Sequence, residues 1–227
     1  MAELKISIVM LGATGATGTQ ALNALLGHPQ VARITLLGRR AMDGLNTKGT
    51  RVDQHIVNID EPDTYREFLP GHQAAICTLG VGQPSKVSRE EFIKIDKTAV
   101  LDFATTCHEA GVGHFEILSS VGAHANSSTY YLRTKGELNE GLAALGFDRL
   151  SLFLPSMILT PNNRYGFGQA VALTLWPILN PLFVGKARKY RGIPVSELGQ
   201  AMALNVFTQG QGVQALHWSE FKAILGK

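Results

Sequence analysis

A tyrosine and a lysine stand at a spacing that suits proton transfer, and a pair of serines precedes them. Tyr131 and Lys135 are four residues apart, so both lie on one face of a helix that carries them. Since a nearby ammonium favours the ionised form of a phenol, the pair predicts a tyrosine that exchanges a proton with a carbonyl or alcohol oxygen. A hydroxyl from Ser120, which we prefer to Ser119, would orient the same oxygen. The alternative for the tyrosine and lysine is a pair on an exposed helix surface.

A glycine-rich turn precedes these residues in the chain and has a spacing that suits a dinucleotide-binding site. Gly12, Gly15 and Gly18 fall at the first, fourth and seventh positions of GATGATG, between an apolar run and a helical pattern. The first glycine permits a tight turn, the second lets the backbone approach a diphosphate, and the third lets the helix pack close to the sheet. Backbone N–H groups at the helix start then face the phosphates. The alternative is a flexible loop between strand and helix.

Two arginines end the second apolar run, where dinucleotide-binding folds read the adenosine ribose. An acidic residue at this place selects NAD through the ribose 2′-hydroxyl, but Arg39 and Arg40 stand here instead. Guanidinium groups bind phosphate well, so the pair predicts NADP, as NADPH, over NAD. A solvated basic loop is the alternative. Asn58 and Ile59, at the end of the third apolar run, are expected to contact the adenine.

The composition is that of a soluble globular protein and argues against several other classes. The 227 residues carry a formal net charge of +3 without a basic run, which argues against nucleic-acid binding. The seven histidines and two cysteines show no metal-ligand spacing, so no metal is expected. Two cysteines are too few for a disulfide framework, and they predict a reducing, cytoplasmic location.

Apolar runs alternate with helical patterns through the first two thirds of the chain, which predicts an α/β fold with a doubly wound parallel sheet of the Rossmann type. We expect strands over residues 5–11, 33–37, 51–59, 73–79, 114–119 and 149–154. We expect helices over residues 17–26, 62–69, 88–110 and 130–145, with Ser88 and Glu91 as a capping box. Ligands of such folds bind at the carboxyl edge of the sheet.

Residues after about 155 form a small C-terminal region that we expect to pack against that edge, so that residues 1–227 make one domain. Residues 166–184 are almost free of charge and approach the length of a bilayer span. Pro177, Asn180 and Pro181 interrupt them. We therefore expect no membrane span there, but a buried helix, a lid over the substrate pocket or a subunit interface.

These motifs resemble the atypical short-chain dehydrogenase/reductase family, and within it the Tat-interacting-protein-like oxidoreductases and their small bacterial relatives. The similar segments run through most of the chain: GATGATG, LGRR, TLG, SSVGA, YLRTK and a strand ending in LP. The resemblance implies a Rossmann fold, NADP(H), and Ser120, Tyr131 and Lys135 as catalytic residues. It also places Leu79 and Gly80 along the ribose-phosphate arm of the cofactor. The expected cofactor-binding residues are then Gly12, Thr14, Gly15, Ala16, Thr17, Gly18, Arg39, Arg40, Asn58, Ile59, Leu79, Gly80, Tyr131 and Lys135.

Two hypotheses of function follow from the residues and the resemblance. The first is an NADPH-dependent reductase or dehydrogenase of a small carbonyl or alcohol, with an apolar pocket lined by residues 156–159 and 167–182. The second is an NADPH-binding regulatory module with little or no turnover, whose cofactor orders a surface for a protein partner. It is motivated by regulators in the family and by Leu154-Pro155-Ser156, where relatives often have Arg-Pro-Gly. The short C-terminal region argues against a third class, the nucleotide-sugar epimerases.

Overall fold

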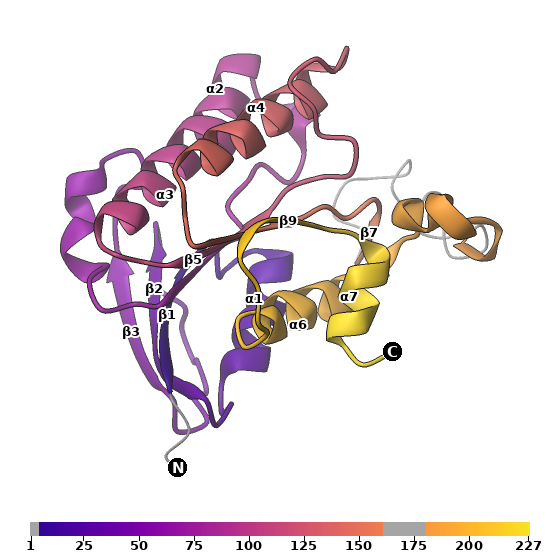
Figure 1. Ribbon diagram of the computed structural model, residues 1–227. Coiled ribbons are helices and arrows are strands. Elements are labelled where there is room, and N and C mark those ends of the chain that lie inside the picture. Colours follow the sequence, from indigo (N-terminus) through magenta and orange to yellow (C-terminus); the bar gives the residue numbers. More distant parts are fainter. Residues whose placement is uncertain (1–4, 161–179) are drawn as a thin grey trace.

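A parallel β-sheet forms the centre of the protein (Figure 1). The computed structural model describes residues 5–160 and 180–227. Within these ranges the sheet has seven strands in the order β3-β2-β1-β4-β5-β6-β9, and each neighbouring pair is parallel. The point at which the strand order reverses therefore lies between β1 and β4, as expected for a Rossmann fold. The strands are β1 (Ile6–Leu11), β2 (Val31–Gly38), β3 (Arg51–Ile56), β4 (Ala74–Cys77), β5 (His114–Leu118), β6 (Arg149–Phe153) and β9 (Gly212–Leu216).

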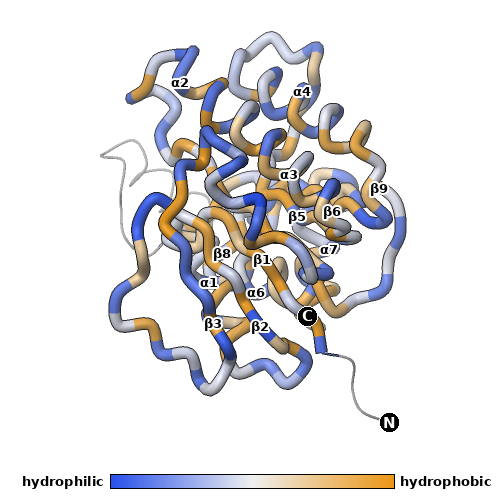
Figure 2. Tube along the Cα trace, turned by 90° about the vertical axis from the view of Figure 1, so that its left-hand side faces the viewer, coloured by the Kyte–Doolittle hydropathy of each residue, from blue (hydrophilic) through white to orange (hydrophobic). Residues whose placement is uncertain are grey.

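Side chains of the central strands are apolar on both faces because helices cover both faces of the sheet. In β1, Ile8 and Met10 belong to one buried cluster, whereas Val9 and Leu11 belong to the cluster on the opposite face. Figure 2 shows β1 as a mostly hydrophobic stretch in the interior. The continuous apolar run that identified this strand in the sequence therefore reflects burial on two sides.

Two groups of helices enclose the sheet (Figure 1). The helices α1 (Ala16–Leu25), α6 (Val195–Asn205) and α7 (Trp218–Ile224) pack on one face. On the other face lie α3 (Ala99–Glu109) and α4 (Tyr130–Ala144), which follow the short helix α2 (Arg89–Ile93). Contact between α1 and α6 is close at Gly199, where a Cβ atom would lie 2.4 Å from Cβ of Gln20.

Two of the expected helices differ in the structure. Residues 62–69 form two 3-10 turns, Pro62–Thr64 and Arg66–Phe68, because the hydroxyl of Thr64 donates to the carbonyls of Asn58 and Glu61 and holds a turn. The expected helix over residues 88–110 is divided by a π-helical segment, Lys94–Thr98, between α2 and α3. The N–H of Glu91 donates to Oγ of Ser88 at 3.1 Å, which is the half of the predicted capping box that forms.

The C-terminal region contributes more to the core than we expected. We expected this region to pack against the carboxyl edge of the sheet. In the structure it also adds strand β9 beside β6, and its helices α6 and α7 cover one face of the sheet. The short strands β7 (Ile158–Leu159) and β8 (Ile193–Pro194) pair separately. Most of the apolar segment 166–184 lies outside the described residues, so its expected roles stay predictions. No helix in the described ranges has the length and apolarity needed to cross a bilayer.

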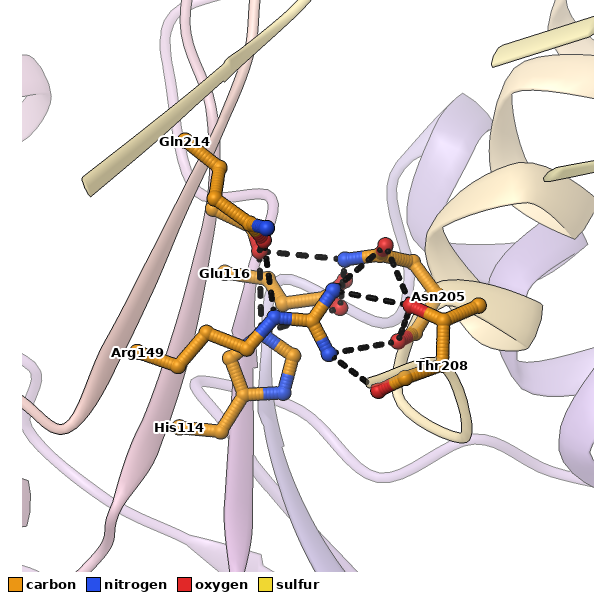
Figure 3. Close-up of polar contacts among 7 residues, drawn as sticks. His114, Glu116, Arg149, Asn205, Thr208 and Gln214 are labelled. Atoms are coloured by element: carbon orange, nitrogen blue, oxygen red, sulfur yellow. Dashed lines mark hydrogen bonds and ion pairs between the residues drawn. The ribbon is translucent and has the colours of Figure 1, made fainter. Parts of the chain in front are cut away.

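A buried polar network fastens the C-terminal elements to the sheet (Figure 3). Arg149, at the start of β6, donates hydrogen bonds to Asn205 and Thr208 at the end of α6 and to Gln214 of β9. Glu116 of β5 is fully buried, accepts a hydrogen bond from Asn205 at 2.8 Å, and has one oxygen, Oε2, without a partner in the part of the chain that the structure describes. Burial raises the pKa of Glu116 to about 8 and lowers the pKa of His114 to about 3.

Candidate functional site

The glycine turn between β1 and α1 is packed so closely that side chains cannot be added to it. Gly12 has φ of +91°, and a Cβ atom there would lie 2.7 Å from N of Leu79. A Cβ atom on Gly18 would lie 2.2 Å from the carbonyl oxygen of Gly12. The hydroxyl of Thr78, after β4, donates to that same carbonyl at 2.9 Å. The turn is therefore held against the end of β4, which gives the first and third glycines the roles predicted from the sequence.

The first turn of α1 leaves its backbone donors available for a ligand. Gly15 is the N-cap residue and supplies no side-chain acceptor, and the first turn carries no acidic side chain. The first N–H groups of a helix have no partner within the helix. Gly15, Ala16 and Thr17 line a cavity of about 430 Å³. This arrangement suits an anion, as expected for the diphosphate of a dinucleotide.

Arg39 and Arg40 lie immediately after β2, beside the glycine turn. Both are exposed, and they line a hollow together with Gly12 and Thr14. Neither arginine makes an ion pair with a residue that the structure describes. Asp43 lines an adjoining hollow with them. Two free guanidinium groups are thus available to a further phosphate near the turn.

The structure separates the two residues expected at the adenine. Ile59 is buried and lines the arginine hollow. Asn58 is exposed and is not among the lining residues, and its side-chain oxygen accepts the N–H of Asp60 at 3.2 Å. The lining residues that the sequence analysis missed include Met42, Gln54 and His55. The side-chain oxygen of Gln54 accepts the N–H of Met42, and its side-chain nitrogen donates to the carbonyl of Met42. These residues are twelve positions apart, so no local sequence pattern predicts the pairing.

The predicted proton-transfer residues meet at the carboxyl ends of the strands. Tyr131 and Lys135, both on α4, line the same cavity of about 430 Å³ as Gly15, and so do Leu79 and Gly80. The hydroxyl of Tyr130 donates instead to the carbonyl of Pro84 at 3.3 Å, away from this cavity. The helical spacing and the sheet topology together therefore bring a phenol and an ammonium beside the open helix start.

Of the two serines after β5, Ser119 rather than Ser120 faces the cavity. Ser119 lines it, is 6% exposed, and has an Oγ atom without a hydrogen-bond partner among the described residues. Ser120 is not among the lining residues, and its hydroxyl makes only a long 3.4 Å contact with the carbonyl of Val121. The cavity lining therefore favours Ser119 over Ser120, whose catalytic role stays a prediction. Both serines follow the last residue of β5, so the alternation of the strand could not choose between them in the sequence.

A buried carboxylate, which the sequence analysis missed, accompanies the lysine. Asp96 lies in the π-helical segment and is 2% exposed. Its Oδ1 atom lies 2.9 Å from Nζ of Lys135, and its Oδ2 atom accepts the N–H of Val81 at 2.6 Å. Burial lowers the pKa of Lys135, but the charge and hydrogen bond of Asp96, together with Tyr131 and Cys77, raise it by more, so that the pKa is above its ordinary value. Asp96 was missed because a regular helix over residues 88–110 gave it no special position.

Curated relatives cover almost the whole chain, whereas no protein-family model matches it. The chain is 33% identical to Protein HTATIP2 of Rattus norvegicus over 219 residues, which are 96% of this chain and 88% of that protein. It is 30% identical to the protein fmp52 of Emericella nidulans, over 73% of this chain and 72% of that one. It is 27% identical to FMP52 of Debaryomyces hansenii, over 95% of this chain and 96% of that one.

The fungal relatives correct one expectation. Their names describe them as mitochondrial. The cytoplasmic location that we expected from the cysteine count is therefore wrong by this comparison. A cysteine count reports the redox state of a compartment, and it does not distinguish one reducing compartment from another.

Solved structures share the fold at low sequence identity. The MoeE5 structure with UDP-glucuronic acid and NAD has a TM-score of 0.70 and 15% identity, covering 92% of this chain and 75% of that one. A UDP-glucose 4-epimerase of Thermotoga maritima has a TM-score of 0.68 and 14% identity, covering 93% and 77%. These likenesses confirm the Rossmann fold that the alternating pattern predicted. The relative that is 33% identical over nearly the whole length shows that the chain belongs to the HTATIP2 family.

Proposed function

We propose that this protein is an NADPH-dependent oxidoreductase that acts on a small carbonyl or alcohol. The observation that carries the proposal is the lining of one cavity. An uncapped helix start, a tyrosine, a lysine and a serine hydroxyl that has no partner within residues 5–160 and 180–227 all face it. The first of these suits a diphosphate, and the other three suit the oxygen of a reacting carbonyl.

The residues present fit NADPH as the cofactor. The backbone amides at the start of α1 would hold the diphosphate, and Arg39 and Arg40 would hold the 2′-phosphate of the adenosine ribose. Leu79 lines both the arginine hollow and the larger cavity, so it lies between the two ends of such a ligand. Asp43, the carboxylate beside the arginines, makes no ion pair with them within the described ranges, which leaves their charge for phosphate.

Side chains of the protein transfer and stabilise the proton of the reaction. When bound, NADPH would supply the hydride for the carbon of the substrate. Tyr131 gives its hydroxyl proton to the carbonyl oxygen in the direction of reduction, and it takes the proton back in oxidation. The Lys135 ammonium stabilises the negative charge left on the phenol oxygen, and the Ser119 hydroxyl donates a hydrogen bond to the substrate oxygen. The adjoining Ile158 and Thr160 offer an uncharged surface to the rest of the substrate.

Replacing Tyr131 tests the proposed proton donor. The Tyr131→Phe variant should lose about 10²- to 10⁴-fold in turnover with a carbonyl that the wild type reduces, because the general acid is removed. Its affinity for NADPH, measured by titration calorimetry, should stay within a few-fold of the wild type. Tyr130→Phe is the matched control and should stay active, since its hydroxyl points to Pro84. Full activity in Tyr131→Phe would reject the donor. NADPH binding without turnover on any carbonyl would favour the regulatory module instead.

Replacing the arginines tests the choice of cofactor. Arg39→Ala with Arg40→Ala should weaken NADPH binding about 10- to 100-fold, which corresponds to ~1.5–3 kcal/mol for hydrogen bonds to a charged group. NADH binding should change little, because NADH lacks the 2′-phosphate. Arg51→Ala is the control, because Arg51 is an exposed arginine on the edge strand β3. Equal losses for the two nucleotides would contradict the proposed phosphate site.

A further inference from the structure

Asp96 holds together three parts of the site that come from different elements. It lies in the π-helical segment, its Oδ1 atom contacts Lys135 of α4, and its Oδ2 atom contacts the backbone of Val81 after β4. Gly80 gives the carboxylate its space, since a Cβ atom there would lie 2.9 Å from Oδ1. A π-helical turn adds one residue to a helix and so redirects the side chains within it, which is how such turns come to serve functional sites.

The surroundings of Lys135 leave Asp96 as its dominant charged partner. Lys135 is 4% exposed, and its other titratable neighbours are Tyr131 on its own helix and Cys77 of β4. Burial raises the pKa of the Cys77 thiol to about 12, so that this group is neutral. An ammonium so deeply buried without a counter-charge would lose its proton more easily than in water.

A second ion pair joins the same two elements and serves as an internal comparison. Lys97, next to Asp96, lies 2.7 Å from Glu137, which is two residues after Lys135. The side chains of this pair are 30% and 39% exposed, against 5% and 3% for Lys135 and Asp96. Both pairs tie α4 to the π-helical segment, but only the buried pair lines the cavity.

We propose that Asp96 is a positioning residue that keeps the Lys135 ammonium charged and directed at the cavity, and thereby sets the alkaline limit of the pH range in which the site works. The proposal rests on the function proposed above, in which Lys135 must be charged. The carboxylate does not touch the substrate oxygen. It acts through the lysine and through the backbone after β4.

Titration of Lys135 itself tests the proposal without any turnover. In protein labelled with ¹³C at lysine Cε, the Lys135 resonance is identified by its loss in Lys135→Met, and its shift is followed with pH. In the wild type this lysine should still be mostly charged at pH 10.5, the ordinary pKa of lysine. In Asp96→Asn, which keeps an acceptor for Val81, its pKa should fall by about 1 to 3 pH units. Glu137→Gln should leave the Lys135 titration unchanged.

Two results would overturn the proposal. One is a Lys135 pKa that is the same in Asp96→Asn as in the wild type. The other is a wild-type Lys135 that loses its proton below pH 10.5, and this result decides the question even if Asp96→Asn does not fold. In an active enzyme, the alkaline limb of the pH profile of kcat/KM should move down by the same interval in Asp96→Asn and stay in place in Glu137→Gln. If the protein did not bind NADPH, the proposed function would be rejected. The titration of Lys135 would still show whether Asp96 keeps the lysine charged.

Discussion

Two buried polar groups lie at opposite ends of the same strands, and they differ in what surrounds them. The Arg149 network lies at the starts of β5 and β6, at the amino edge of the sheet. Its guanidinium donates hydrogen bonds to Gln214, Asn205 and Thr208. The Asp96 and Lys135 pair lies beyond the carboxyl ends of the strands and borders a cavity of about 430 Å³. Both bury charge and both border a hollow, of about 480 Å³ at Arg149 and about 430 Å³ at Lys135. They differ in that the Arg149 guanidinium is bonded within the chain, whereas the second pair lies beside groups with unused bonding capacity.

The difference separates groups that stabilise the fold from groups that are available for chemistry. A buried donor that is fully paired within the chain contributes to stability and has nothing left to offer a ligand. The cavity retains groups with unused bonding capacity, such as the Ser119 hydroxyl and the N–H groups at the start of α1. Incomplete pairing beside a cavity is therefore the better indicator of a site than burial of charge alone.

The largest effect that would sharpen this comparison is the loss of Arg149. Arg149→Met should lower the free energy of unfolding by about 3–5 kcal/mol, because it removes the guanidinium that donates to the buried Asn205 and to Thr208 and Gln214, and it takes a positive charge away from the buried Glu116. Chemical denaturation measures the change. The folded variant should bind NADPH as the wild type does. An unchanged unfolding midpoint, or a stable variant that no longer binds NADPH, would break the distinction between the two regions.

A smaller, pH-dependent effect should follow from Glu116. Its pKa is raised in the folded protein to about 8, so the stability that it contributes is present below its ordinary pKa of 4.5 and is lost as the pH rises through 8. Between pH 7 and pH 9 the wild type should lose about 1.4 kcal/mol from this group. Glu116→Gln should lack that loss. The lowered pKa of His114 makes the stability fall only as the pH drops below 6.5, so it does not affect the interval between pH 7 and pH 9. Parallel stability curves for wild type and variant over this interval would contradict the assignment.

The smallest effect on stability is expected at Ser119, on the cavity side of the comparison. Ser119→Ala removes a buried hydroxyl without a partner, so the free energy of unfolding should stay constant or rise by up to about 1 kcal/mol. Turnover should nevertheless fall about tenfold, because the substrate oxygen loses a donor. Ser120→Ala is the matched control and should change turnover little. A loss of turnover in Ser120→Ala but not in Ser119→Ala would instead assign the hydrogen bond to the substrate oxygen to Ser120.

Local patterns in the sequence were sufficient for the fold class and for much of the site. The strands β1, β2, β4, β5 and β6 were found because burial on both faces requires apolar runs, and GATGATG marked the turn because side chains do not fit at Gly12 and Gly18. The spacing of Tyr131 and Lys135 placed them on one helix face. Short β9 lacked such a run, because this edge strand is only partly buried.

The sequence by itself determined the alternation of strands and helices, the glycine turn, the arginine pair and the tyrosine–lysine helix, since each depends on neighbours within a few residues. Only the tertiary structure decided that Ser119 faces the cavity, that Asp96 joins Lys135, and that Arg149 binds the end of α6. Those pairings link residues far apart in the chain, and they exist because strand order, helix packing and one π-helical turn bring their atoms within hydrogen-bonding distance.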